Sequence, residues 1–333
     1  MTVNTDPAAA PVLPQTLFLL EPQYRERVWG GQRLLAHTPP IGEAWIAHGE
    51  SVVGSGAAQG HTLDALLRGE LAGLDAASLL GTEVAAHTSG FPLLIKLLDC
   101  ADWLSVQVHP NDEQASTMVG PGMLGKTEAW HFLEVEPGAE ILAGVTRGTS
   151  AAELAAAIRG GTVLDVSQRH GVQAGDTAFI PAGTLHALGP GMLLYEVQEA
   201  SDTTYRVYDW DRPASAGRAL HIEESVAVTD PALRGDLRRA AETHGQGVLT
   251  SCEYFVLEGE TLSGGAEQAT TGGQHFHLIT VVEGAAALVC GSERLELGKF
   301  QTALVAGAAG AYQLSALEEG ARVLRSSVPA AAH

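Results

Sequence analysis

One stretch in the first half of the chain, Leu104–Pro110, carries side chains that could do chemistry. Apolar and polar residues alternate strictly along it, so that one face of an extended strand carries only polar groups. These are the hydroxyl of Ser105, the amide of Gln107 and the imidazole of His109. Such a face could hold a metal ion beside a phosphate group. A half-buried strand with a solvated polar side is the plainer interpretation of the same alternation.

A second pattern follows further along the chain. From Gly175 to His186 the spacing is G, five residues, P, one residue, G, two residues, H, which resembles the second signature of the cupin barrels. In this interpretation the Pro and the Gly bend a tight turn between two strands, and His186 points into the mouth of a barrel. The alternative is a Pro-Gly hairpin with an incidental surface histidine.

The first cupin signature usually provides two histidines and a glutamate. Here Gln107 and His109 stand in the place of the two histidines, and Glu128 follows on a later segment. Together with His186 they give two neutral imidazoles, a carboxylate and an amide oxygen, a set that suits zinc and tolerates related divalent ions. Glu128 alone is more commonly a surface carboxylate, so it is the four residues in order that favour a metal site.

Strands must position these groups, and strand-like segments dominate the chain: Phe91–Leu98, Leu104–His109, Ala139–Gly144, Thr177–Ile180, Leu193–Gln198 and Thr204–Asp209. Helical patterns interrupt them at about 61–90, where leucines recur at helical spacing, and at about 150–160, which opens with a capping box. A second β-rich unit begins near Ser251. Like the first half of the chain it has short strands separated by glycine turns, which suggests a weak internal repeat of one barrel type. The sequence therefore predicts a mainly β fold of two cupin-type (jelly-roll) β-barrels with a helical insertion in the N-terminal half.

We expect a disordered tail at 1–15, a catalytic cupin domain at 16–230 that contains both helical insertions, and a C-terminal cupin-like barrel at 231–333. The second barrel offers His275 and His277, but Gly310 stands where a third histidine would follow Gly307 at the spacing seen in the first barrel. We therefore expect the second barrel to lack a complete metal site.

Composition narrows the function. The 333 residues include 39 acidic and 19 basic side chains, a formal charge of −20, so we expect no nucleic-acid partner, because such binding needs Lys and Arg to neutralise phosphates. An anionic small molecule would instead need a local basic pocket. No apolar run approaches the roughly 20 residues of a membrane span, and the N-terminal residues lack a secretory signal pattern. With three widely spaced cysteines and no C-x-x-C pair, these features favour a cytoplasmic protein without membrane contact.

Several motifs in order resemble those of the type I mannose-6-phosphate isomerases, and the chain is most similar to the short bacterial form. The motifs are Gln107–Pro110, Gly125–Trp130, Pro181–Ala187 and Ser201–Asp209, with Tyr24–Gly31 and Gly42–Trp45 resembling the amino-terminal motifs of the family. The resemblance covers most of residues 16–230 and, more weakly, the C-terminal barrel.

This resemblance implies a zinc enzyme, with one Zn²⁺ per chain, that interconverts mannose 6-phosphate and fructose 6-phosphate. Carried over by position, the zinc ligands would be Gln107, His109, Glu128 and His186. The resemblance assigns catalysis to Arg206 and Glu196. It places on the phosphate side of the pocket Ser105, Lys96 and Lys126. The expected partner is a small sugar phosphate, and the expected assembly is a monomer or a homodimer.

The chemistry agrees with these assignments. An aldose–ketose isomerisation moves a proton between C2 and C1 through an enediol, so it needs a base, a cation for the developing oxyanion and an anchor for the phosphate. We expect Glu196 as the base, or alternatively as a group that orients another residue. Lys96 lies in an apolar strand and needs a partner, either a phosphate or a carboxylate such as Asp99. His131 stands where the family has Tyr, and is expected in the pocket wall.

Other functions remain open. One alternative is an isomerase of another sugar phosphate on the same scaffold, and another is a non-catalytic sugar-binding cupin. A metal-dependent oxygenase is less favoured, because it would usually use redox-active iron and Gln107 replaces a histidine in the ligand set.

Overall fold

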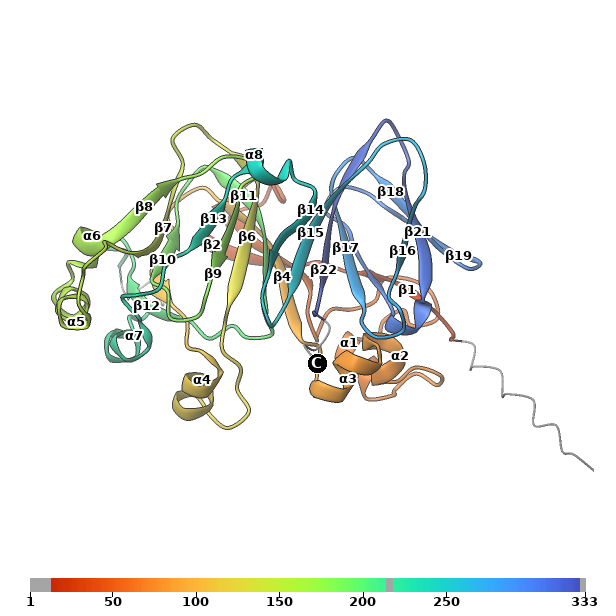
Figure 1. Ribbon diagram of the computed structural model, residues 1–333, viewed down its shortest axis with the longest axis horizontal. Helices are drawn as coiled ribbons and strands as arrows, with labels where there is room; N and C mark the ends of the chain where they lie inside the picture. The colour runs from red at the N-terminus through yellow and green to blue at the C-terminus, as the bar shows by residue number, and fades with distance from the viewer. Residues whose placement is uncertain (1–12, 214–217, 330–333) are drawn as a thin grey trace, which may run out of the picture.

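The computed structural model describes residues 13–213 and 218–329, so most of the expected tail at 1–15 lies outside the described residues. Two β-barrels stand side by side, each made of two sheets (Figure 1). Neighbouring strands pair in antiparallel fashion throughout the sheets, for example β11 (Met192–Glu199) with both β4 (Leu93–Cys100) and β6 (Glu128–Val135). The predicted mainly β fold with two jelly-roll barrels is confirmed.

The first barrel consists of a seven-stranded and a five-stranded sheet. In sheet order, the larger contains β13 (Asp236–Arg238), β9 (Thr177–Ile180), β6, β11, β4, β2 (Gln23–Gly31) and β3 (Ile41–Ala47). The smaller contains β12 (Tyr205–Tyr208), β5 (Val106–Val108), β10 (His186–Leu188), β7 (Glu140–Val145) and β8 (Ser167–Gly171). The polar face predicted for Leu104–Pro110 therefore lies on the second strand of the smaller sheet.

The second barrel consists of a six-stranded and a four-stranded sheet. The larger contains β1 (Leu17–Leu20), β20 (Thr302–Val305), β17 (His277–Glu283), β22 (Ala321–Ser327), β15 (Val256–Leu262) and β14 (Gly247–Ser251). The smaller contains β16 (Glu267–Thr270), β21 (Ala311–Ala316), β18 (Ala286–Cys290) and β19 (Glu293–Leu297).

The expected division into residues 16–230 and 231–333 would assign β1 to the first barrel and β13 to the second. In the structure each of these strands pairs within the opposite barrel. The strand β1 pairs with β20 of the second barrel, in a register that joins Leu17 to Val305 and Leu20 to Thr302. Conversely, β13 pairs with β9 of the first barrel. Pairing between strands so far apart leaves no local pattern in the sequence. We propose the two barrels, rather than the two linear ranges, as the domains.

Short helices cover the ends of the barrels. They are α1 (Leu63–Leu67), α2 (Ala76–Leu80), α3 (Thr82–His87), α4 (Asp112–Met118), α5 (Ala151–Gly160), α6 (Val163–Val166), α7 (Ile222–Val228) and α8 (Ala240–Thr243). The side chain of Ser150 caps α5, and Glu153 completes a capping box. Among the described residues, every helix is too short or too polar to cross a bilayer.

The helices α1 to α3 lie beneath the second barrel (Figure 1). The backbone N–H groups of Thr82 and Glu83 donate to the carbonyls of Gly273 and Gln274 at 3.0 and 3.1 Å. Gly81, between α2 and α3, has φ +90°, and a Cβ built on it would lie 2.2 Å from the backbone of Gln274. Only glycine fits at this position. The turn between α2 and α3, called the corner below, thereby packs against the second barrel and closes one of its ends.

The largest apolar cluster joins the two barrels and includes Leu97 and Val197 from the first and Leu257 and Leu324 from the second. His131 faces this interface, where its Nδ1 lies 2.9 Å from the hydroxyl of Thr177 and its side chain is fully buried. The expectation that it forms part of the pocket wall is therefore wrong. Side chains alternate along β6, so the residues on either side of Trp130 face the other barrel.

Candidate metal centre

Three of the four predicted ligands converge inside the first barrel, brought together from both of its sheets. Glu128 begins β6, His186 begins β10, and His109 directly follows β5. One ligand atom from each lies within 4.8 Å of the others. The Nε2 atom of His109 is 3.6 Å from Oε2 of Glu128, and Nε2 of His186 is 3.3 Å from Oε1. A single ion could therefore contact all three residues.

Backbone carbonyls fix the orientation of both imidazoles. Nδ1 of His109 lies 2.9 Å from the carbonyl of Thr203, and Nδ1 of His186 lies 2.8 Å from that of Thr184. A carbonyl only accepts, so each Nδ1 carries the proton and donates it. Each Nε2 then presents a lone pair toward Glu128, which is the tautomer a metal ligand needs.

The site contains buried polar atoms without hydrogen-bond partners. Within the described residues these include Nε2 of His109 and both carboxylate oxygens of Glu128. Burial lowers the pKa of His186 to about 4, and burial together with the charge of Lys126 holds the pKa of His109 well below its usual range. Buried groups of this kind are costly unless something pairs with them. Two neutral imidazoles around a buried carboxylate fit a divalent cation.

Gln107 reaches the same group from the middle of β5. Its Cα pairs with that of His186 across β5 and β10, and its Nε2 lies 3.2 Å from Nε2 of His186. The hydroxyl of Ser105 donates to its Oε1 at 3.2 Å. In this arrangement the amide nitrogen of Gln107 faces His186. Ligation through the amide oxygen therefore requires a flip of the amide group by about 180°, which exchanges Oε1 and Nε2, two atoms of nearly equal size.

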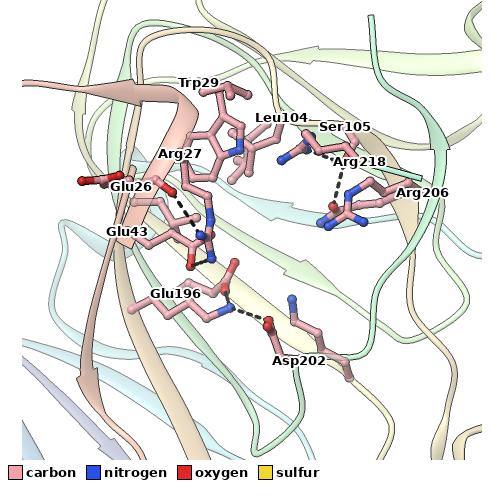
Figure 2. Close-up of a pocket in the computed structure, with 16 residues that line it drawn as sticks. Glu26, Arg27, Trp29, Glu43, Leu104, Ser105, Glu196, Asp202, Arg206 and Arg218 are labelled. Atoms are coloured by element: carbon pink, nitrogen blue, oxygen red, sulfur yellow. Dashed lines mark hydrogen bonds and ion pairs between the residues drawn. The ribbon is translucent and has the colours of Figure 1, made fainter. Parts of the chain in front are cut away.

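A cavity of about 350 Å³ opens beside this centre. Figure 2 shows Ser105, Arg206 and Arg218 along one side, with Glu196 and Asp202 on another. The residues that line it are Glu26, Arg27, Val28, Trp29, Glu43, Lys96, Leu98, Leu104, Ser105, Gln107, Lys126, Leu188, Glu196, Asp202, Arg206 and Arg218. The cavity therefore brings all the predicted catalytic and substrate-binding residues together, and gathers cations in a strongly acidic protein.

The two lysines are buried and paired with carboxylates. Lys126 lies 3.0 Å from Oε2 of Glu128, and Lys96 lies 3.2 Å from Glu196 and 3.6 Å from Asp202. Burial alone would lower the pKa of Lys96, but the surrounding carboxylates outweigh it and raise the pKa above its usual value. Asp99, the carboxylate considered from the sequence, instead accepts the backbone N–H of Arg33.

Glu196 lies at the centre of β11 and is almost fully buried. The indole N–H of Trp130 donates to its Oε2 at 3.0 Å, while its other oxygen is the partner of Lys96. Burial raises the pKa of Glu196, and the charge of Lys96 offsets part of this effect. A carboxyl group whose neutral form is favoured in this way suits a group that accepts and returns a proton.

Two guanidinium groups flank Ser105. Nη2 of Arg218 donates to the serine hydroxyl at 3.3 Å, and Nε of Arg218 donates to Asp209 at 2.8 Å. Nε of Arg206 is buried without a hydrogen-bond partner among the described residues. Burial and the charge of Arg218 lower the pKa of Arg206, so an anion between the two would stabilise both charges.

Sequence reasoning missed five charged residues of the cavity: Glu26, Arg27, Glu43, Asp202 and Arg218. Arg27 and Glu43 form a two-bonded ion pair at 2.8 and 3.2 Å, which the indole of Trp45 joins at 2.7 Å. Four of the five lie inside the motifs quoted above, and membership of those motifs was the signal that could have identified them. Arg218 lies in a stretch between regular elements and had no such signal.

Comparisons with known proteins agree with this geometry. Residues 17–124 match the family described as "Phosphomannose isomerase type I, catalytic domain". Mannose-6-phosphate isomerase ManA of Bacillus subtilis (strain 168) is 35% identical over 320 residues, 90% of this chain and 96% of the relative.

Solved structures are similar as well. The crystal structure of the mannose 6-phosphate isomerase from Bacillus subtilis has a TM-score of 0.78 at 29% identity and covers 94% of this chain and 99% of its own. A zinc-bound mannose 6-phosphate isomerase has a TM-score of 0.70 at 17% identity, over 94% of this chain and 99% of its own, and that likeness shows the fold alone. Similarity over nearly the whole length, on a fold with this centre at its core, establishes that the chain belongs to the type I phosphomannose isomerase family.

Proposed function

We propose that the protein is a metal-dependent aldose–ketose isomerase that interconverts mannose 6-phosphate and fructose 6-phosphate. The observation that carries the proposal is the convergence of the buried His109, Glu128 and His186 side chains beside a cavity that contains several cations. A sugar phosphate matches this arrangement, because its oxygens suit a metal ion and its phosphate suits guanidinium groups. The relatives named above act on this substrate by name.

We propose one Zn²⁺ per chain as the metal, with Gln107, His109, Glu128 and His186 as its ligands. The nitrogen and oxygen donors suit zinc, and a solved isomerase of the same fold is zinc-bound. When bound, the ion would act as a Lewis acid toward the sugar oxygens. The carbonyls of Thr203 and Thr184 would keep both imidazoles in the ligating tautomer.

The proposed reaction moves one proton between C2 and C1 and one between their oxygens, and it needs no oxidant. The C2–H bond of mannose 6-phosphate breaks, its electron pair forms the C1=C2 double bond, and the C1 carbonyl oxygen gains a proton to give the enediol. Return of a proton to C1, with loss of the O2 proton, gives the ketose. Glu196 is the proposed base, and Trp130 and Lys96 hold its carboxylate in place. Arg206 would stabilise the enediolate charge.

The phosphate is proposed to bind at the other end of the cavity, at Arg218 and the hydroxyl of Ser105, which lie 3.3 Å apart. The side chains of Ser105 and Arg218 lie along the same wall of the cavity (Figure 2). Lys96 and Lys126 were also expected on this side, but each is already paired with a carboxylate. Their ammonium groups are better placed beside the reacting carbons and the metal ligands.

The test is a coupled assay with mannose 6-phosphate on one preparation whose zinc content is also measured. We expect about one zinc per chain, and loss of turnover on chelation that added zinc restores. Glu128→Gln should weaken zinc binding by more than about 100-fold, above the range for outer-shell partners, because it removes a ligand charge.

Glu134→Gln is the matched control, since Glu134 lies on the same strand but forms a half-exposed pair with Lys299. Full turnover by metal-free protein would refute the metal role. Turnover only with another sugar phosphate would favour a different isomerase, and binding without turnover would favour a sugar-binding cupin.

A further inference from the structure

A buried carboxyl group outside the cavity contacts the segment that leads to Glu128. Glu199 ends β11, and its side chain is only 3% exposed. The backbone N–H of Thr127 donates to its Oε1 at 2.7 Å, and its own backbone N–H donates to the carbonyl of Thr127 at 3.2 Å. The residue before the proposed metal ligand is thus held twice by one glutamate.

A second carboxyl group joins the first. The carboxylate of Asp112, the first residue of α4, lies close enough to Glu199 to raise the pKa of that carboxyl group. One oxygen of Asp112 accepts the backbone N–H of Gly125 at 2.6 Å. The other accepts the hydroxyl of Tyr254 at 3.4 Å, and Tyr254 lies between β14 and β15 of the second barrel. The contact therefore spans both barrels.

The three residues that precede Glu128 are each tied down by a different group. Gly125 is held by Asp112, Thr127 by Glu199, and the backbone N–H of Lys126 donates to the carbonyl of Pro110 at 3.0 Å. Strand β6 begins only at Glu128, so no sheet pairing holds this segment. Its position, and with it the positions of the Lys126 ammonium and the Glu128 carboxylate, depends on these bonds.

We propose that Glu199 is a positioning residue which, with Asp112 and Tyr254, sets the place of Lys126 and Glu128 at the metal centre. The second barrel then takes part in forming the site of the first through Tyr254. The inference rests on the proposed function, because it assigns Glu128 to the metal.

The charges around Glu199 give the proposal a measurable signature. Burial and the neighbouring charge of Asp112 raise the pKa of Glu199 to about 8, although the Thr127 N–H lowers it in part. The β14–β15 loop adds Cys252, Glu253 and Tyr254 but no cation, and Lys126 is engaged with Glu128. At neutral pH the Glu199 carboxyl group therefore carries a proton, and above about pH 8 it becomes negatively charged beside the charge of Asp112.

The experiment compares Glu199→Gln, Glu199→Ala and the wild type, with zinc affinity measured by chelator competition at about pH 7 and about pH 9. Glutamine mimics the protonated acid, since its oxygen can accept from Thr127 and its NH₂ can donate to Asp112. We expect wild-type zinc affinity and kcat to fall between the two pH values and those of Glu199→Gln to stay level. Glu199→Ala should weaken zinc binding by about 10- to 100-fold, the range for outer-shell partners.

Glu253→Gln is the matched control, because it removes one exposed negative charge from the same region without touching Thr127. It should keep the pH dependence of the wild type. Tyr254→Phe should weaken zinc binding less than Glu199→Ala does, and the two effects should not add, because both act on one contact.

A pH dependence of Glu199→Gln identical to that of the wild type would overturn the proposal, even if Glu199→Ala failed to fold. Wild-type zinc affinity in Glu199→Ala would do the same. If the wild type binds zinc but does not isomerise mannose 6-phosphate, the proposed function fails while the affinity measurements still test the positioning role.

Discussion

Arg218 is the residue on which substrate affinity should depend most. Its guanidinium is held by Asp209 at 2.8 Å and reaches Ser105 at 3.3 Å, so it is ordered before a phosphate arrives. Hydrogen bonds to charged groups contribute about 1.5–3 kcal/mol, or a factor of about 10 to 150. We expect Arg218→Ala to raise KM for mannose 6-phosphate by that factor with a smaller effect on kcat.

Steady-state kinetics measure this effect. Arg159→Ala is the control, because Arg159 forms an exposed ion pair with Glu223 and neither residue lines the cavity. An unchanged KM in Arg218→Ala would place the phosphate elsewhere in the cavity, for example at Lys96 or Lys126.

His131 should make the fold sensitive to acid. Burial lowers its pKa to about 4, whereas an unfolded histidine titrates near 6.5. Between these values the unfolded chain binds more protons, so the free energy of unfolding falls as the pH falls from about 6.5 to about 4. At about pH 5 this residue alone should cost about 2 kcal/mol.

We expect His131→Gln to reduce this slope, measured as urea-unfolding free energy against pH. The exposed His37 provides the control variant, His37→Gln. Equal slopes in the wild type and His131→Gln would show that other groups govern acid stability.

At the scale of elements, the corner between α2 and α3 fixes the helical insertion to the second barrel. Gly81→Ala would place a methyl group 2.2 Å from the Gln274 backbone at a φ that alanine rarely adopts. Strain of this kind costs about 1–3 kcal/mol, and the clash adds to it. We expect the free energy of unfolding, measured in urea, to fall by about 2–4 kcal/mol.

Gly60→Ala separates the two causes. Gly60 has φ +86°, close to that of Gly81, but open space surrounds its Cβ position. The decrease in the free energy of unfolding of Gly60→Ala should therefore reflect backbone strain alone, about 1 kcal/mol. Equal losses in the two variants would mean that the corner yields without disturbing the barrel.

The sequence predicted those elements whose signals are local. Alternation in Leu104–Pro110 placed Gln107 and His109 on one polar face, and the turn spacing before His186 placed a histidine at the start of β10. Motif resemblance supplied Glu128, which no periodicity would distinguish from a surface carboxylate. The sequence did not identify Arg218, because this residue lies outside helices and strands, where residue spacing does not indicate which way a side chain points.

Two features were harder to predict from the sequence: which face of a strand meets the cavity, and which strands pair with each other. The side of β6 that His131 occupies follows from alternation, but which side meets the cavity depends on the partner sheet. Likewise, nothing in Leu17–Leu20 indicates β20 as its partner, since that pairing is decided by packing across almost the whole chain.

At the scale of the whole molecule, the largest apolar cluster contains residues of both barrels, so the barrels should unfold together. Phe18 lies on β1 within this core and is fully buried. Phe18→Ala should lower the free energy of unfolding by about 3–5 kcal/mol. All five tryptophans precede residue 211, in the part of the chain that forms the first barrel, so their fluorescence reports on that barrel although the change lies in the second.

We expect fluorescence and circular dichroism of Phe18→Ala to shift to lower urea concentration in a single common transition. Tryptophan signals that stay at the wild-type midpoint, with only part of the dichroism lost early, would show two independent units. Val28→Ala, at an exposed position of β2, is the control.

The place of β1 also bears on the order in which the protein is made. The ribosome produces this strand before the strand that completes it, and nearly all of the chain separates the two. At about 5–20 residues per second the delay is on the order of half a minute. Throughout that time an apolar strand with open edges must stay free of wrong partners, so newly made chains should depend on chaperones far more than the finished enzyme does.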